Sequence, residues 1–159
     1  MENLWAPWRK AYIQKEKKEE GCLFCRILEV NEDEANLVLI RKERCFVMLN
    51  LYPYNNGHLM IAPYAHVASL EALEKEDRDD LFETVAKACE NLRTEMNPEG
   101  FNIGMNIGAI AGAGIADHIH VHIVPRWGGD TNFMPVVGTV KVISEMLQDT
   151  YNRLKKYDY

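Results

Sequence analysis

Three of the five histidines in this chain of 159 residues stand at alternate positions, His118, His120 and His122. Isoleucine or valine occupies the position after each of them. Because successive side chains of a β-strand point to opposite faces, the pattern predicts a strand with three imidazoles on one face and three aliphatic side chains in the core. Imidazole titrates near neutral pH, so it can serve as nucleophile, proton carrier or metal ligand.

Three interpretations of this histidine face are open. The imidazoles could simply be polar groups on an exposed strand face, although histidine is rare in the chain and the alternation is strict. Alternate histidines on a strand could also bind one metal ion. In the third interpretation, one ring nitrogen attacks phosphorus while the N–H of the other donates a hydrogen bond to a backbone carbonyl, which fixes the tautomer.

A glycine-rich segment before the histidines favours a phosphate ligand over a bare metal ion. Its four glycines are Gly104, Gly108, Gly112 and Gly114. Glycine permits close approach of the backbone, and successive amide N–H groups can bind anionic oxygens, although such loops are often only turns. Asn106 is a further candidate donor, whereas for Asn102 we favour ordinary hydrogen bonding at a sheet edge.

The pair Cys22 and Cys25 forms a Cys-x-x-Cys motif, which is compatible with zinc binding, redox chemistry or coincidence. The flanking residues lack the strand-to-helix context of a redox motif. Structural zinc needs two more ligands, and a histidine near the next strands, His58 or His66, is available. Cys45 and Cys89 lie in apolar patterns and are expected in the core.

The remaining pattern predicts an antiparallel sheet in an α+β domain. Strands are expected at 36–41, 45–49, 59–62, 101–106 and through the histidines, with an amphipathic helix over 77–96. A final helix is expected within 139–159, on the apolar spacing from Val142 and Ile143 to Leu154. The whole chain, 1–159, is predicted to form one domain with an N-terminal extension at 1–20.

Composition restricts the function. A hydrophobic content of 47% with 26% charged residues is typical of a globular protein, and apolar runs are too short to span a membrane. The net charge of −6 disfavours general nucleic-acid binding but leaves room for a small anionic ligand. Four cysteines without a secretion signal at the start of the chain favour reduced thiols and a cytoplasmic location.

The chain resembles the histidine-triad (HIT) superfamily of nucleotide hydrolases and transferases, and the likeness extends over nearly its whole length. It rests first on His118-x-His120-x-His122, and its long form is most similar to the bacterial diadenosine tetraphosphate phosphorylase branch. The other matching segments are 4–9 (LWAPWR), 22–25 (CLFC), 50–60 (NLYPYNNGHLM), 101–106 (FNIGMN), 112–115 (GAGI) and 125–138 (PRWGGDTNFMPVVG).

This resemblance implies a fold, a partner and a role for individual residues. It implies a homodimer in which two five-stranded sheets, each with one long helix and a C-terminal helix, join into one continuous sheet. His120 would attack the α-phosphorus and form a nucleotidyl-histidine, His122 would contact the same phosphate, and His58 would support the triad. Asn50 would lie near the ribose, Asn106 would bind phosphate or orient the leaving group, and Gly112 and Gly114 would lie in the phosphate-binding loop.

The resemblance also implies cofactors. Zinc-bearing members have ligands that match Cys22, Cys25, His66 and His118, so structural zinc would sit beside the nucleophile, because residues i and i+2 of a strand lie about 6.6 Å apart. A divalent cation could accompany the nucleotide substrate.

The identity of two residues favours phosphorolysis over hydrolysis. Where one HIT branch of hydrolases has glutamine, this chain has Gly114, and where a branch of phosphoramidases has serine, it has Ile115. The missing side chains would leave space for inorganic phosphate as second-step acceptor. The sequence therefore predicts cleavage of diadenosine tetraphosphate with phosphate to ATP and ADP; hydrolysis of dinucleoside polyphosphates or related adenosine nucleotides to AMP is the alternative.

Two other classes of function remain open. A zinc hydrolase could use the three histidines as ligands of a catalytic metal, in which case a chelator should stop activity at once. A non-catalytic module would bind adenine nucleotides without forming a covalent adduct.

Overall fold

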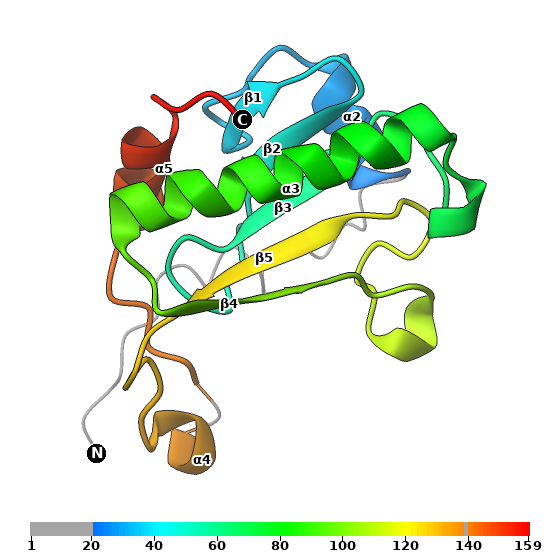
Figure 1. The fold of residues 1–159 in the computed structure, drawn as a ribbon. Helices are drawn as coiled ribbons and strands as arrows, with labels where there is room; N and C mark the ends of the chain where they lie inside the picture. The colour runs from blue at the N-terminus through cyan, green and yellow to red at the C-terminus, as the bar shows by residue number, and fades with distance from the viewer. Residues whose placement is uncertain (1–20, 139) are drawn as a thin grey trace.

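The computed structural model describes residues 21–138 and 140–159, so the expected N-terminal extension at 1–20 lies outside the described residues. One five-stranded antiparallel sheet organises the molecule in the order β1-β2-β3-β5-β4 (Figure 1), which confirms the predicted fold class. Its strands are β1 (Val38–Arg41), β2 (Cys45–Leu49), β3 (Leu59–Pro63), β4 (Gly100–Gly104) and β5 (Val121–Arg126).

The long helix α3 (Lys75–Met96) covers one face of the sheet, close to the predicted range 77–96. Its apolar residues recur at three and four positions, and the buried members include Leu81, Val85 and Leu92. They pack against alternate residues of β2, such as Val47, and against Ile123 of β5 in the main core cluster. Asn97 caps the helix in the left-handed conformation, at φ 47°.

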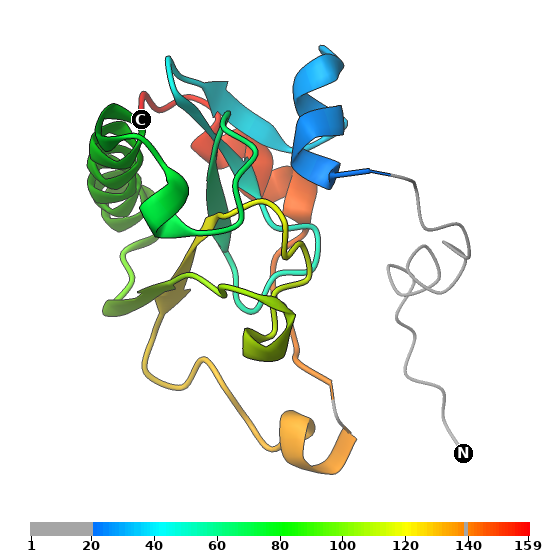
Figure 2. The ribbon, with the colours of Figure 1, turned by 90° about the vertical axis from the view of Figure 1, so that its right-hand side faces the viewer.

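A second, smaller apolar cluster lies on the opposite face, beneath the short helix α2 (Leu23–Glu29). Figure 2 shows α3 and α2 on opposite sides of the sheet. Phe24 and Ile27 of α2 contribute to this cluster with Phe46 and Met48 of β2 and Met60 of β3. Because β2 and β3 are covered on both faces, every residue of these two strands is buried.

The C-terminal helix is shorter than predicted. α5 spans only Leu147–Leu154, and Val142 and Ile143 precede it in an irregular segment. Tyr151 and Leu154 reach the core, whereas the side chain of Val142 is 53% exposed, so nothing in the core holds this part of the apolar pattern in a helix. A small helix, α4 (Met134–Gly138), lies away from the sheet (Figure 1), and Phe133, Val136 and Val137 beside or within it are exposed.

The loop 50–58 between β2 and β3 needs a glycine at one point. Gly57 has φ +71°, and a Cβ atom there would lie 2.7 Å from Sδ of Met96 at the end of α3. Glycine therefore allows this loop to turn against the helix immediately before His58. Among the described residues, no helix combines the length and apolar character needed to cross a membrane.

Candidate active site and metal centre

The histidine segment has the predicted alternation but only part of it is paired strand. β5 begins at Val121, after His118 and His120, and Ile119 N–H instead donates to Val67 O at 2.7 Å. Ile119, Val121 and Ile123 are buried in the main core, as expected. On the other face, the imidazoles of His118 and His120 are buried as well, which argues against the interpretation that they are polar groups on an exposed strand face.

Two neighbouring strands define the surroundings of His122. Met60 of β3 and Gly104 of β4 stand directly opposite it in the sheet. Met60 belongs to the cluster beneath α2, so the histidines face the α2 side and the aliphatic residues face α3. Gly104 has no side chain to cover His122 from the β4 side, and a Cβ atom added there would meet nothing within 4 Å.

Hydrogen bonding fixes which nitrogen of His120 is free. Nδ1 of His120 lies 2.9 Å from the carbonyl oxygen of His118. A carbonyl oxygen only accepts, so Nδ1 carries the proton and Nε2 of the neutral ring keeps its lone pair. Phe24 packs against His120 with ring centroids 4.9 Å apart, and the His122 ring lies 4.8 Å away on another side. The buried ring is therefore held in place with Nε2 as its unprotonated nitrogen.

His118 has the opposite tautomer. Its Nε2 donates to Pro63 O at 2.9 Å, which leaves Nδ1 as an acceptor. Nδ1 lies 3.3 Å from Sγ of Cys22, 3.7 Å from Sγ of Cys25 and 3.3 Å from Nδ1 of His66. The four residues come from the start of α2, the segment after β3 and the histidine segment.

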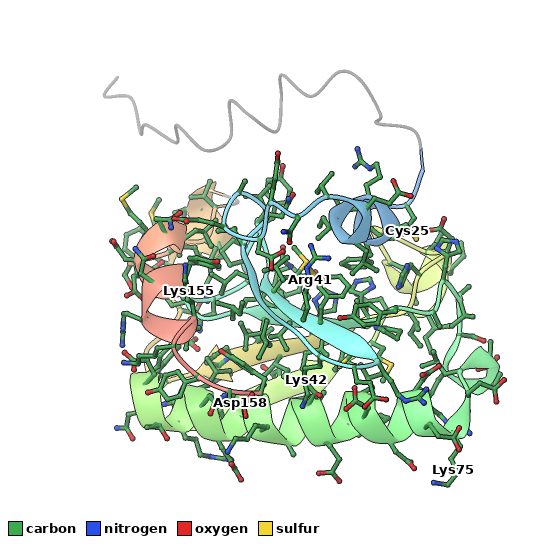
Figure 3. The ribbon with its side chains drawn as sticks, turned by 90° about the horizontal axis from the view of Figure 1, so that it is seen from above. Cys25, Arg41, Lys42, Lys75, Lys155 and Asp158 are labelled. Atoms are coloured by element: carbon green, nitrogen blue, oxygen red, sulfur yellow. The ribbon has the colours of Figure 1, made fainter. Side chains whose placement is uncertain are left out.

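This cluster could hold a metal ion, and its donors are of the kinds that bind zinc. The ligand atoms of Cys22, Cys25, His66 and His118 all lie within 4.8 Å of one another. Two thiols and two imidazoles are a common donor set for structural zinc, and ligating histidines usually donate their other N–H to a carbonyl or carboxylate. His118 does so to Pro63 O, and Nε2 of His66 lies 3.7 Å from the Asp117 carboxylate. Figure 3 shows Cys25 on α2, on the side of the sheet away from α3.

A chain of hydrogen bonds orients His122. The backbone N–H of Tyr54 donates to Nδ1 of His58 at 3.0 Å, so the proton of the neutral His58 ring is on Nε2. That Nε2 lies 2.9 Å from Nδ1 of His122, which must accept. The remaining nitrogen of His122, Nε2, then carries its proton and is a donor. His120 and His122 therefore present a lone pair and an N–H respectively.

Burial keeps these imidazoles neutral. Desolvation, with a smaller contribution from neighbouring imidazoles, lowers the pKa of His58 to about 3 and that of His122 to about 4. The pKa values of His118 and His120 are also lowered by desolvation, although the hydrogen bonds from their ring N–H groups to backbone carbonyls act in the opposite direction. At neutral pH the described site is thus a set of neutral donors and acceptors rather than a cationic cluster.

The other predicted polar residues differ from one another in burial and in hydrogen bonding. Asn50 is buried beside His58, with its Oδ1 accepting from Tyr52 N–H at 2.9 Å and its Nδ2 3.5 Å from Nδ1 of His58. Asn106 is half-buried just after β4. Asn102 accepts from Arg126 at 2.7 Å, in line with the sheet-edge role expected of it.

The glycine-rich segment contains a short 3-10 turn, η2 (Ala109–Ala111). Gly108 and Gly112 flank it with positive φ, and a Cβ atom at either of them or at Gly114 would meet nothing within 4 Å. Ile115 packs against the cluster beneath α2, which places the end of this segment on the histidine side of the sheet. Binding of phosphate by Gly112 or Gly114 stays a prediction.

Sequence reasoning missed two contributors to the site. Helix α2 was not expected, although Phe24 and Ile27 stand at helical spacing, and its Phe24 contacts both His118 and His120. The N–H of Tyr54 and the carbonyl of Pro63 were also missed, because backbone groups have no signature in the identity of a residue.

Comparison with known proteins shows the family of the chain. The model of the HIT domain matches residues 31–129, and the chain therefore belongs to the HIT domain family. Its expected membership of this family is confirmed.

Three individual proteins that are similar to this chain illustrate the comparison. The chain is 40% identical over 158 residues to AP-4-A phosphorylase of Mycobacterium tuberculosis, covering 94% of this chain and 80% of that protein. It is 30% identical to an adenosine 5'-monophosphoramidase of Schizosaccharomyces pombe, covering 67% of this chain and 74% of the relative. A Zn-bound histidine triad family protein from Mycobacterium smegmatis has a similar fold, with a TM-score of 0.68 at 22% identity over 85% of this chain and 91% of that one.

Proposed function

We propose that this chain is a nucleotidyltransferase that cleaves diadenosine tetraphosphate with inorganic phosphate, releasing ATP and ADP. The observation that carries the proposal is the free Nε2 of His120, whose Nδ1–H is bonded to the His118 carbonyl at 2.9 Å. Identity of 40% to AP-4-A phosphorylase of Mycobacterium tuberculosis supports this substrate.

The reaction has two displacements at the same phosphorus. Nε2 of His120 attacks the α-phosphorus, a P–N bond forms, the P–O bond to the departing ATP breaks, and the ring becomes an adenylyl-histidine. An oxygen of inorganic phosphate then attacks that phosphorus, the P–N bond breaks, and ADP leaves with His120 restored. Splitting one difficult displacement into two is the gain from covalent catalysis. The N–H on Nε2 of His122 would donate to the phosphoryl oxygens in both steps.

A neutral site leaves the charge of the polyphosphate without a counter-charge from the histidines. Lowered pKa values keep His58 and His122 uncharged at neutral pH. We therefore propose that a divalent cation enters with the nucleotide, because cations that bridge phosphate oxygens neutralise such charge effectively.

Zinc is the proposed resident metal, held by Cys22, Cys25, His66 and His118. The convergence of these donors and the zinc in the related Mycobacterium smegmatis structure support it. Bound zinc would supply a structural tie between α2 and the histidine segment. His118 presents its side chain to this cluster while its carbonyl holds the proton of His120. The protein residues, not the metal, would carry the phosphoryl chemistry.

A homodimer with a continuous sheet is the proposed assembly. β4 is the edge strand of the sheet, and Ile103 on it is 48% exposed. Pairing of two β4 strands would satisfy the free backbone groups of both edges. The cytoplasmic location, inferred from the cysteine content, stays a prediction.

Phosphate is the proposed second-step acceptor because of Gly114. A Cβ atom at this position would meet nothing within 4 Å, so open space adjoins the backbone four residues before His118. A glutamine side chain there would occupy part of that space.

Product analysis tests the function. Purified protein is incubated with diadenosine tetraphosphate and a divalent cation, with and without phosphate, and the nucleotides are separated by chromatography. We expect phosphate-dependent ATP and ADP in equal amounts. AMP formed at the same rate with or without phosphate would establish the hydrolase alternative. Gly114→Gln should raise the share of AMP, and His120→Asn is the inactive control.

A further inference from the structure

Asp130, in the segment Trp127-Gly128-Gly129-Asp130, lies outside the chemistry described so far but forms an extensive network. Its carboxylate is only 6% exposed. It accepts from Nε of Arg126 at 2.6 Å, from Nη2 of Arg126 at 3.0 Å and from the N–H of Trp127 at 3.1 Å. A bidentate guanidinium pair with a further backbone donor fixes the carboxylate in one orientation.

The same carboxylate reaches the loop that precedes His58. Nδ2 of Asn55 donates to Oδ2 of Asp130 at 2.8 Å and to the carbonyl oxygen of Pro125 at 2.9 Å. Both protons of this amide are therefore used, and both acceptors belong to the end of β5 or the turn after it. Because Asn55 is buried, its side chain anchors the loop rather than solvating it.

Asn55 is directly connected to the group that sets the tautomer of His58. The carbonyl oxygen of Asn55 accepts from the backbone N–H of His58 at 3.3 Å. The preceding residue is Tyr54, whose N–H donates to Nδ1 of His58 at 3.0 Å. A displacement of Asn55 would therefore shift both backbone contacts of His58 and, through His58 Nε2, the contact with His122.

Little packing would hold the 50–58 loop in place if Asn55 lost its hydrogen bonds to Asp130 and Pro125. Asn55, Trp127 and Asp130 line a cavity of about 660 Å³ that extends to Met96 and Arg153. The cavity is largely polar in its lining residues, and its charged members are paired, Asp130 with Arg126 and Arg153 with Glu145. Water rather than apolar contact would fill the space if Asn55 moved.

We propose that Asp130 is a positioning residue, which through Asn55 fixes the Tyr54–His58–His122 hydrogen-bond chain and so keeps the proton of His122 on Nε2. This inference deepens the proposed function, and it rests on it for the phosphoryl role of His122. Asp130 does not touch the reacting atoms. Its effect is to make one tautomer of two histidines persist, which determines whether His122 presents a donor or an acceptor to the phosphate.

The test reads the tautomers directly, without substrate. Long-range ¹H–¹⁵N NMR spectra of the zinc-loaded protein at pH 7 report which ring nitrogen of His58 and His122 carries the proton. In the unmodified protein both should be protonated on Nε2 alone. In Asp130→Asn, which preserves size but replaces one of the two acceptor oxygens by an amide donor among the donors of Arg126, Trp127 and Asn55, both should become tautomer mixtures. Asn55→Ala removes only the bridge and should give the same mixtures with the Asp130–Arg126 pair intact.

Lys141→Met is the matched control. Lys141 contacts the backbone oxygen of Asp130 at 3.0 Å and its carboxylate at 3.9 Å. This change leaves the bonds among Asp130, Arg126 and Asn55 in place, so the His58 and His122 tautomers should be unaltered. The same change of tautomer in Lys141→Met would overturn the assignment to Asn55.

Single-turnover kinetics supply the second measurement. The rate of adenylyl-His120 formation should fall about 10-fold to 100-fold in Asp130→Asn and Asn55→Ala, with the nucleotide concentration at half saturation changed less than twofold. Loss of rate with tautomers unaltered, or single tautomers in both variants, would contradict the proposal. If unmodified protein forms no adduct although its tautomers are as described, the proposed function fails and the positioning role of Asp130 stands.

Discussion

The two ends of the histidine segment are held in contrasting ways. At His118, two thiols and another imidazole converge on one ring nitrogen, and the other nitrogen donates to a carbonyl. At His122, a single imidazole, His58, holds one nitrogen, and His58 in turn depends on one backbone N–H from a loop. At His118 several side chains surround one ring nitrogen, whereas at His122 the hydrogen bonds form a single linear chain.

This difference shows how identical side chains acquire different chemistry. His118 turns an unprotonated Nδ1 towards the cysteine thiols, His120 has an unprotonated Nε2, and His122 presents Nε2–H. None of these states depends on the alternating spacing. Each is decided by what the other nitrogen of the ring contacts, so removing a contact at one end should have effects unlike those at the other.

The largest effect is expected between the two ends, at His120, the proposed nucleophile. His120→Asn should lower turnover by on the order of 10⁴-fold or more, because no other described group offers the attacking nitrogen. Mass spectrometry after acid-free quenching should detect adenylyl adduct in the unmodified protein and none in the variant. Retention of an adduct on the variant would transfer the nucleophilic role to another residue.

At the metal end, Cys25→Ser should act on stability rather than on the chemical step. A metal ion at 100 to 1,000 times its Kd stabilises a folded protein by about 3–4 kcal/mol, and most of this should be lost. Urea unfolding with parallel zinc analysis measures it. Cys89→Ala, which alters a buried thiol of the main core outside the cluster, is the control that should keep its zinc. Immediate loss of all turnover on chelation, with the fold intact, would favour a catalytic metal instead.

At the His122 end, acid should destabilise the protein through its neutral imidazoles. The folded-state pKa values of His58 and His122 are about 3 and about 4, below the usual 6.5. Below pH 6.5 the two imidazoles therefore bind protons in the unfolded chain but stay neutral in the folded protein. The free energy of unfolding consequently falls as pH decreases. The slope is at most about 1.4 kcal/mol per pH unit for each imidazole between pH 6.5 and 4.

The contribution of one imidazole can be isolated in a Cys25→Ser background, where acid release of metal does not interfere. Urea unfolding from pH 7.5 to 4.5 should show a smaller slope in His58→Leu than in its parent. Equal slopes would mean that His58 takes up its proton at the same pH in the folded protein as in the unfolded chain.

The smallest effect is expected at Asn50. Its Nδ2 lies 3.5 Å from His58 Nδ1, at the limit of a hydrogen bond, while Tyr54 N–H occupies the same acceptor at 3.0 Å. Asn50→Ala should change the free energy of unfolding by only about 1 kcal/mol. Its predicted place near the ribose should appear as a raised KM. A change in the His122 tautomer would instead place Asn50 in the hydrogen-bond chain.

Periodicity predicted the sheet, the long helix and the face of each histidine-segment side chain, because these follow from what must be buried. It could not predict where β5 begins. Pairing with β3 covers only Ile61 to Leu59, and His118 and His120 lie beyond it, where Ile119 pairs with the loop at Val67. The point at which a strand begins is determined here by tertiary contacts rather than by residue type.

For the site, the sequence predicted the members but not their burial or their tautomers. Residue types and family resemblance brought His58, His118, His120 and His122 together, and the cluster of Cys22, Cys25, His66 and His118 has the expected members. The burial of His118 and His120 beneath Phe24 was not predicted, because α2 is only seven residues long and its apolar spacing covers two turns. The tautomers depend on carbonyl and amide groups that every residue has.

Zinc binding at the proposed metal site would also affect the order of folding. Cys22 and His118 are 96 positions apart in the chain, so a metal ion shared by them closes a long loop. Such a contact is entropically expensive to form early, and most of the sheet must already be in place before it can form. Zinc should therefore slow unfolding while leaving the rate of folding nearly unchanged, a difference that stopped-flow measurements with and without the metal would reveal. The cluster would act as a late-closing cross-link, which extends the lifetime of a fold that is reached without it.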